Sequence, residues 1–187
     1  MLEILKESLL TCPMVKREKD GVVYNYFINP LTDGIPEVTA ELLRDVTAAM
    51  MASLDLKNVD KIVVSEAMGI HIGTALTLAT GIPFVVIRKR EYRLPGEVVI
   101  GQETGYSKGT LYMNCVHKGD RVVIIDDVIS TGGTIKGILP ALKIAGAELV
   151  DILFVVNRGS PDIGIPYKTL VTIDVDENGV KIIDSAF

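Results

Sequence analysis

The sequence predicts an α/β protein with a mostly parallel, twisted sheet flanked by helices, and three observations support this fold class. Strand-like apolar runs alternate along the chain with helix-like segments. Residues 122–125 are an unbroken run of β-branched apolar residues, as in a central parallel strand covered on both faces. The 187 residues, 48% of them hydrophobic, suffice for one well-filled core, so we predict a single domain over residues 1–187.

The individual elements follow from the apolar periodicity. The first ten residues have the pattern of an amphipathic helix, and apolar residues at helical spacing predict a helix over residues 37–53, after Pro36. The remaining predicted elements are strands over 61–64, 82–87, 121–125, 150–156 and 169–175 and helices over 70–79 and 133–145. Gly146 suits a left-handed helix end. Pro140 lies inside the last helix at a cost of about 3 kcal/mol, so we expect a kink or an early break there.

Charge and cysteine content exclude several classes of protein. A net charge of −5 and a pI near 5.1 argue against a general nucleic-acid binder, which needs a basic face. Cys12 and Cys115 have neither metal-ligand spacing nor the density of a secreted disulfide framework. No apolar run approaches the roughly 18 to 20 residues of a membrane span. We therefore expect a cytoplasmic protein with no membrane or nucleic-acid partner.

The most specific pattern is the stretch from Val122 to Thr134. Asp126 and Asp127 follow the apolar strand at the edge of an open sheet where ligands bind, and adjacent acids there suit a vicinal diol or a magnesium ion held through water. Next comes a small hydroxyl-bearing and glycine-bearing loop, made of Ser130, Thr131, Gly132, Gly133 and Thr134. Its backbone amides can converge on one phosphate, toward which the next helix aims its positive end.

The same residues have a plainer interpretation when taken singly. Asp126-Asp127 suits a helix cap, and Gly132-Gly133 suits an ordinary turn. The unbroken order of strand, acid pair, loop and helix favours a sugar-phosphate site. A Walker A loop is absent because Ile138 stands where that motif requires lysine.

Two further segments have the composition of a diphosphate site. The turn Ser65-Glu-Ala-Met-Gly-Ile70 joins a predicted strand to a helix, whose first amides can bind an anion, although Glu66 also suits a solvated cap. The basic run Arg88-Lys89-Arg90 closes the next predicted strand. Such a run is often a solvated edge, but here it faces the ligand rim of the sheet.

Residues 91–112 are long for a connection in a compact domain and rich in glycine and polar residues. Such loops close over reactive intermediates and exclude water, which predicts a mobile lid. An exposed β-hairpin without catalytic consequence is the alternative.

Residues 122–134 closely resemble the phosphoribosyl-diphosphate-binding motif of the type I phosphoribosyltransferases. The resemblance implies that Asp126 and Asp127 hold the ribose hydroxyls and steady an oxocarbenium-like ribose, and that residues 130–134 wrap the 5′-phosphate. It also implies Mg²⁺ held through the substrate and water, with Asp126 and Asp127 as candidate ligands.

The other segments resemble this family as well. Residues 65–70 are similar to its pyrophosphate loop, so the resemblance implies diphosphate contacts from Ala67, Met68 and Gly69. The adenine-specific members usually have Arg where Met68 stands, which leaves backbone contacts. Arg88 and Lys89 match basic residues that reach the diphosphate in relatives, often across a dimer interface, and residues 91–112 match the flexible catalytic loop.

Base recognition is assigned by resemblance to both ends of the chain. Residues 26–33 resemble the hood that covers the base in adenine and xanthine enzymes, and we assign the hood to about residues 1–36 plus a C-terminal segment. Asn29 is then expected to meet the purine, although it suits a turn with Pro30 equally well. Arg158 matches a strand end where xanthine enzymes place Lys. A donor to a purine 6-oxo group discriminates against adenine by roughly 1 to 3 kcal/mol.

Two family features are missing from this chain. The hypoxanthine-guanine enzymes have Asp at the position of Ser130, and adenine enzymes have Glu directly before the lid tyrosine, where this chain has Gly105. The nearest acid in the lid is Glu103, which becomes the candidate catalytic acid.

Taken whole, the chain is most similar to the archaeal hypoxanthine/guanine phosphoribosyltransferases. The resemblance implies a Mg²⁺-dependent homodimer that transfers ribose 5-phosphate from phosphoribosyl diphosphate to hypoxanthine or guanine in purine salvage. The alternatives are an adenine or xanthine enzyme and a non-catalytic regulator that senses phosphoribosyl diphosphate.

Overall fold

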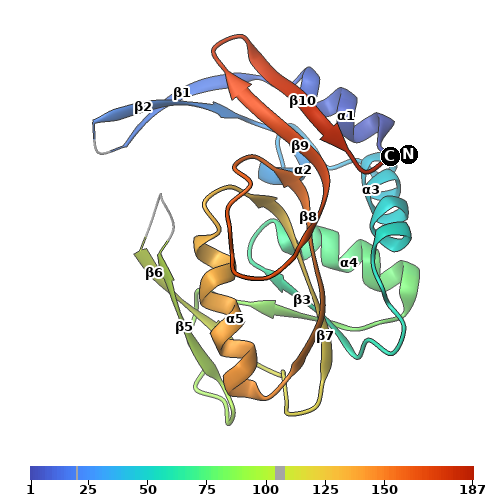
Figure 1. Cartoon of the computed structure of the whole chain (residues 1–187), viewed down its shortest axis with the longest axis vertical. Coiled ribbons are helices and arrows are strands. Elements are labelled where there is room, and N and C mark those ends of the chain that lie inside the picture. Colours follow the sequence, from blue (N-terminus) through green and yellow to red (C-terminus); the bar gives the residue numbers. More distant parts are fainter. Residues whose placement is uncertain (20, 104–107) are drawn as a thin grey trace.

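The structure is a computed structural model that describes residues 1–19, 21–103 and 108–187. Its central sheet consists of β3 (Lys61–Ser65), β4 (Phe84–Ile87), β7 (Arg121–Ile129), β8 (Glu148–Asn157), β9 (Lys168–Asp176) and β10 (Gly179–Ser185). The strands lie in the order β10-β9-β8-β7-β3-β4, and all neighbours are parallel except β9 and β10 (Figure 1). The predicted α/β class with a mostly parallel sheet is confirmed.

The helices are α1 (Glu3–Leu10), α2 (Pro30–Asp33), α3 (Ala40–Ser53), α4 (Gly69–Thr80) and α5 (Gly133–Ala145). Two small hairpins are formed by β1 (Met14–Lys19) with β2 (Val22–Phe27) and by β5 (Val98–Glu103) with β6 (Lys108–Met113). Helices and the β5–β6 hairpin cover the sheet, and the β1–β2 hairpin extends beyond one end of it (Figure 1). Helices α1, α3 and α4 pack on one face, and α5 with the β5–β6 hairpin packs on the other.

The strand residues alternate between two apolar cores, one on each face of the sheet. Val123 and Ile125 of β7 belong to the core under α1, α3 and α4, whereas Val122 and Ile124 belong to the core under α5. All four side chains are at most 2% exposed. Burial on both faces explains the continuous apolar run, because neither side of the strand meets water.

The segment predicted as a hood contains α1, the β1–β2 hairpin and α2. Helix α1 contacts β10, and β2 contacts β9, so the two ends of the chain pack together. Strand β1 was not predicted, because its sequence Met-Val-Lys-Arg-Glu-Lys lacks an apolar pattern. Its structure comes from antiparallel pairing with β2.

Several predicted bounds differ from the structure, and three of the differences have a clear physical reason. Strand β7 does not end at Ile125 but continues to Ile129, because it stays paired with β8. Helix α3 begins at Ala40, where the Thr39 hydroxyl accepts a hydrogen bond from the Leu42 amide at 3.2 Å. Helix α5 does not break early at Pro140 but runs to Ala145, and Gly146 ends it in the left-handed conformation.

Residues 91–112 hold more regular structure than the predicted lid loop. The β5–β6 hairpin buries Ile100, Leu111 and Met113 in the core beneath α5. The hairpin and the helix approach closely at Gly137, where an added Cβ would lie 2.5 Å from the carbonyl oxygen of Gly101. The hairpin tip, residues 104–107, lies outside the described residues.

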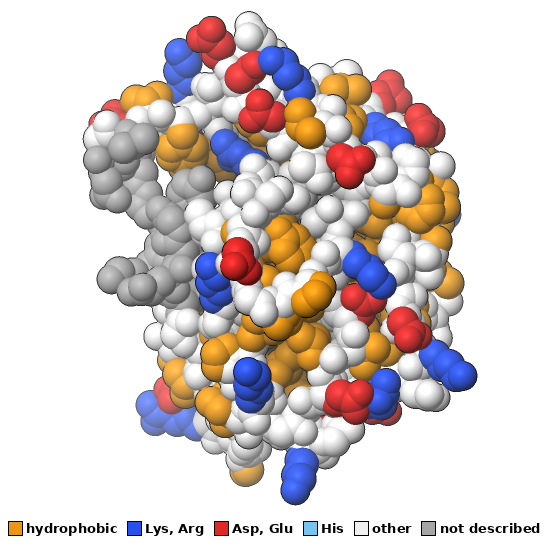
Figure 2. Space-filling model, in the orientation of Figure 1, with side chains coloured by type: hydrophobic (Ala, Val, Ile, Leu, Met, Phe, Trp, Pro, Cys, Tyr) orange, Lys and Arg blue, Asp and Glu red, His pale blue; other side chains and the backbone are white. Residues whose placement is uncertain are grey.

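The surface carries charges of both signs. On the face shown in Figure 2, acidic and basic side chains are interspersed around apolar side chains that gather over α5 and the β8–β9 connection. Among the apolar side chains of α5, Ile144 is 73% exposed. Within the described ranges, no helix has the length and apolar content needed to cross a bilayer.

Candidate active site

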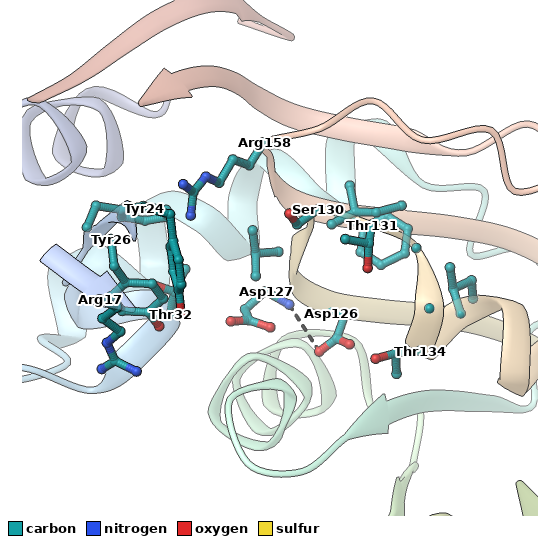
Figure 3. A pocket seen from close by; sticks show the side chains of 17 residues that line it. Arg17, Tyr24, Tyr26, Thr32, Asp126, Asp127, Ser130, Thr131, Thr134 and Arg158 are labelled. Atoms are coloured by element: carbon teal, nitrogen blue, oxygen red, sulfur yellow. Dashed lines mark hydrogen bonds between the residues drawn. The ribbon is translucent and has the colours of Figure 1, made fainter. Parts of the chain in front are cut away.

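A cavity of about 350 Å³ opens at the carboxyl end of β7, between that strand and the β1–β2 hairpin (Figure 3). Its lining includes all the residues predicted to bind the sugar phosphate, namely Asp126, Asp127, Ser130, Thr131, Gly132, Gly133 and Thr134. In Figure 3 the acid pair lies between this loop and the side chains of the hairpin. The predicted phosphate loop and acid pair therefore share one cavity.

The acid pair occupies a stretch of β7 that has a neighbour on one side only. The last pair with β3 is Val64 with Ile125, whereas pairing with β8 continues through Asp126 to Ile129. On the side of β7 where β3 has ended, Gly69 at the start of α4 lies next to the acid pair. An added Cβ there would lie 3.0 Å from Val64 Cβ and 3.2 Å from Asp126 Oδ1, so the lack of a side chain lets α4 begin against the carboxylate.

The electrostatics of the acid pair favour a ligand that donates hydrogen bonds or carries positive charge. Burial raises the pKa of Asp126 to about 6. Burial, and then the neighbouring Asp126 charge, raise the pKa of Asp127 well above its usual range. The Asp127 amide donates to Asp126 Oδ1 at 3.2 Å, and Ser65 donates to the same carboxylate. Ribose hydroxyls or a magnesium ion would lower the cost of two adjacent buried charges.

The loop after β7 has the geometry of an anion site. Gly132 has a φ of +75°, and an added Cβ would lie 2.9 Å from Ile163. Helix α5 starts directly afterwards, at Gly133. The backbone amides of residues 131–133 donate to no acceptor in the described part of the chain. They are therefore available to a phosphate at the positive end of the helix.

The segment after β8 supports this loop from behind. The Arg158 amide donates to the Ile129 carbonyl at 2.9 Å. A Cβ at Gly159 would lie 2.3 Å from the Ser130 carbonyl oxygen, so only glycine fits. Asn157 Oδ1 accepts from the Ser160 amide at 2.8 Å, which fixes the turn.

A second cavity, of about 270 Å³, adjoins the first and shares Asp126, Asp127, Val128 and Thr134 with it. Its other walls come from the predicted diphosphate elements and from the β5–β6 hairpin, namely Ser65, Glu66, Ala67, Met68, Lys89 and Leu111. The structure therefore brings Ala67, Met68 and Lys89 to the acid pair, whereas Gly69, the third residue predicted for this loop, lines neither cavity.

The Arg88 side chain does not line this second cavity. Its Nε lies 2.6 Å from Glu66 Oε2, so the guanidinium is bound to the pyrophosphate-loop carboxylate. Arg88 therefore pairs with a residue of the cavity wall and does not line the cavity itself, and its contact with the diphosphate stays a prediction.

Arg158 closes the other end of the first cavity. Its Nη2 donates to the Asn25 carbonyl at 2.8 Å, and its guanidinium lies 5.9 Å from the centre of the Phe27 ring. A guanidinium has five N–H groups, so donors remain for a ligand. The order along the joined cavities is thus diphosphate wall, acid pair with phosphate loop, and a cationic end under the hairpin.

Comparison with known proteins identifies the family. The sequence profile of the phosphoribosyl transferase domain matches residues 38–183. The chain belongs to this family. It is 60% identical to the hypoxanthine/guanine phosphoribosyltransferase of Methanosphaerula palustris over 98% of both chains. It is 57% identical to that of Methanocella arvoryzae, over 98% of this chain and 96% of the relative.

Solved structures agree with this assignment. Adenine phosphoribosyltransferase from Rhodothermus marinus superposes with a TM-score of 0.66 at 26% identity, and the match covers 90% of this chain and 96% of that chain. The predicted type I phosphoribosyltransferase fold is confirmed.

Asn29 does not reach the base pocket of this phosphoribosyltransferase. The residue is 0% exposed and lines neither cavity. Its Oδ1 accepts from the Leu31 amide at 2.9 Å and its Nδ2 donates to Ser8 Oγ at 3.1 Å, which makes it the N-cap of α2. The assignment of Asn29 to the purine is therefore wrong, and the alternative of a turn with Pro30 is the one observed.

The hood contributes residues that the sequence analysis missed. The first cavity is also lined by Arg17, Tyr24, Tyr26, Phe27 and Thr32. Tyr24 and Tyr26 are two apart on β2, and Arg17 lies 4.2 Å from the centre of the Tyr26 ring. The available signal was this Tyr-Asn-Tyr spacing, which places both rings on one side of a strand.

The predicted acid Glu103 is the last residue of β5. Its side chain lies outside the described residues, as does residue 105. The role of Glu103 therefore stays a prediction.

Proposed function

We propose that this phosphoribosyltransferase transfers ribose 5-phosphate from phosphoribosyl diphosphate to N9 of hypoxanthine or guanine and releases pyrophosphate, in purine salvage. One observation carries the proposal. The two joined cavities are lined by the residues predicted for the diphosphate, the acid pair and phosphate loop predicted for the ribose 5-phosphate, and Arg158 with the hood residues, so one continuous space could hold both reactants around C1 of the ribose.

Each end of the cavity supports a separate part of the reaction. The amides of residues 131–133 and the start of α5 would bind the 5′-phosphate, and Ala67 and Met68 with Lys89 would bind the diphosphate. Asp126 and Asp127 would accept hydrogen bonds from the ribose hydroxyls and stabilise positive charge as the bond to the diphosphate breaks. Holding the purine and the ribose in the correct relative orientation would accelerate the reaction further.

The acid pair also fits a magnesium ion. Carboxylate oxygens are ligands that Mg²⁺ prefers, and this ion keeps several waters and binds substrate phosphates. Asp126 and Asp127 would hold it directly or through water, with the diphosphate completing its shell. When bound, the ion neutralises charge on the leaving pyrophosphate.

The preference for a 6-oxopurine rests on Arg158 and on the relatives. A guanidinium at the base end donates hydrogen bonds, which suits a 6-oxo oxygen and leaves adenine's exocyclic amine unmatched. The relatives named hypoxanthine/guanine phosphoribosyltransferase are at least 52% identical, whereas the Rhodothermus marinus adenine enzyme is 26% identical. Adenine and xanthine remain the competing bases.

A steady-state assay with four purines tests the proposal. We expect hypoxanthine and guanine to give kcat/KM values roughly tenfold or more above that of adenine. If adenine or xanthine were turned over faster, the protein would be assigned as the phosphoribosyltransferase of that base. Binding of phosphoribosyl diphosphate without nucleotide formation from any purine would support the regulator instead.

The homodimer and the cytoplasmic location remain predictions from the sequence. Size-exclusion chromatography with light scattering measures the first, and fractionation of the source cells measures the second.

A further inference from the structure

Glu66 lies where the pyrophosphate loop meets the end of β4, and both of its carboxylate oxygens are bound. Oε2 pairs with Arg88 Nε at 2.6 Å, and Oε1 accepts from the Lys89 amide at 2.7 Å. The Glu66 amide donates to the Ile87 carbonyl at 3.0 Å. This one residue therefore holds three successive residues at the end of β4.

Arg88 connects the same cluster to the β5–β6 hairpin. Its amide donates to the Tyr112 carbonyl at 3.0 Å, and the Tyr112 amide donates to the Arg88 carbonyl at 2.7 Å. Leu111, next to Tyr112, lines the second cavity. Arg88 thus links two parts of the cavity wall. Its ion pair holds the pyrophosphate loop at Glu66, and its isolated β-bridge with Tyr112 holds the strand that carries Leu111.

The sign of the Glu66 charge shows that it does not serve as a direct ligand for an anion. A carboxylate in the wall of a diphosphate pocket repels the ligand unless it is neutralised. The Glu66 side chain is 16% exposed, so its pairing with Arg88 is only partly screened by water. The pair cancels the charge of Glu66 and leaves Lys89 to face the cavity.

We propose that Glu66 is a positioning residue for the diphosphate group, which fixes the loop 67–69 and Lys89 and ties them through Arg88 to the base of the hairpin. The inference rests on the proposed function, because the diphosphate is that of phosphoribosyl diphosphate. The same arrangement would hold free pyrophosphate in the reverse reaction.

Glu66→Gln tests the proposal because glutamine keeps an oxygen for the Lys89 amide but loses the charge that holds Arg88. We expect KM for phosphoribosyl diphosphate to rise roughly tenfold. KM for hypoxanthine and kcat should change by less than about twofold, since the base end is untouched. Glu66→Ala, which loses both contacts, should raise KM further.

Glu148→Gln is the matched control. Glu148 pairs with Arg121 at the same 2.6 Å distance, but at the amino end of the sheet and away from both cavities. Its substitution should leave every kinetic constant within about twofold of wild type. Thermal melting of each variant separates misfolding from a local effect.

Two results would overturn the inference. One is an unchanged KM for phosphoribosyl diphosphate in a folded Glu66→Gln protein. The other is an increased KM that excess Mg²⁺ restores to the wild-type value, which would make Glu66 a metal ligand. Isothermal titration of wild type and Glu66→Gln with magnesium pyrophosphate gives the same comparison without turnover. If the wild-type protein shows no turnover, only the proposed function is contradicted. If Glu66→Gln binds magnesium pyrophosphate about tenfold more weakly than wild type, the role of Glu66 is still supported.

Discussion

The two ends of the joined cavities are built differently. The sugar-phosphate end comes from one continuous stretch, in which β7 leads through residues 126–134 into α5. The base end combines residues that are distant in sequence, such as Arg17 and Tyr26 of the hood and Arg158 after β8. A site formed by one continuous stretch can be recognised as a sequence motif, whereas a site assembled by folding consists of residues that are far apart in the sequence. The chemistry of the ribose was therefore easier to predict than the contacts of the base.

Replacement of an acid at the continuous end should have the largest effect. Asp127→Asn keeps the size of the side chain but loses a charge beside the ribose, so we expect kcat to fall about a hundredfold or more. The measurement is steady-state turnover with hypoxanthine at saturating phosphoribosyl diphosphate. Asp184→Asn, at an exposed acid outside both cavities, is the control and should keep wild-type turnover. Equal rates in the two variants would remove the assigned role of Asp127.

A change at the assembled end should alter preference more than rate. Arg158→Leu removes the donor facing the purine, so we expect the ratio of kcat/KM for hypoxanthine to that for adenine to fall roughly tenfold. Competition between the two purines measures this ratio directly. Arg44→Leu is the control, because the Arg44 side chain is 78% exposed on α3, and it should leave the ratio unchanged. A retained preference in the Arg158 variant would shift base selection to the other hood residues.

The smallest expected effect is on stability and its dependence on pH. The folded-state pKa of Asp126, about 6, lies above the ordinary carboxyl value near 4. Between those two pH values the folded state holds a proton that the unfolded state has released, so the stability of the fold decreases as pH rises from about 4 to about 6, and ionised Asp126 destabilises the fold above that range. Asp126→Asn carries no charge. Its melting temperature should exceed that of wild type by more at about pH 7.5 than at about pH 5. A pH-independent difference would contradict the raised pKa.

The sequence predicted those parts of the fold that depend on local pattern. Helix α5 matches its predicted bounds, since glycine residues mark both ends. The end of β7 could not be placed, because residues 126–129 owe their strand conformation to pairing with β8. For residues 91–112 the sequence left a mobile lid and a β-hairpin as alternatives, because the glycine content conceals the apolar residues Ile100 of β5 and Leu111 and Met113 of β6 that pack under α5.

The candidate site shows the same division. Residues 126–134 were predicted because order and spacing alone distinguish them, and residues 65–68 because they follow a strand in the same way. Asn29 was misassigned since its polarity fits a ligand contact and a helix cap equally, and burial beside Ser8 decides between them. The ion pair that occupies Arg88 could not be foreseen, because it joins two segments that meet only at the sheet edge.

The absence of a side chain at Gly137 has a consequence beyond packing. Helix α5 begins at the phosphate loop, and one turn later it rests directly on the backbone of β5. Even a methyl group at this position would act as a wedge between the two and push outward the hairpin that carries Leu111 into the second cavity. Substrate affinity can therefore be lost by a change at a residue that lines neither cavity.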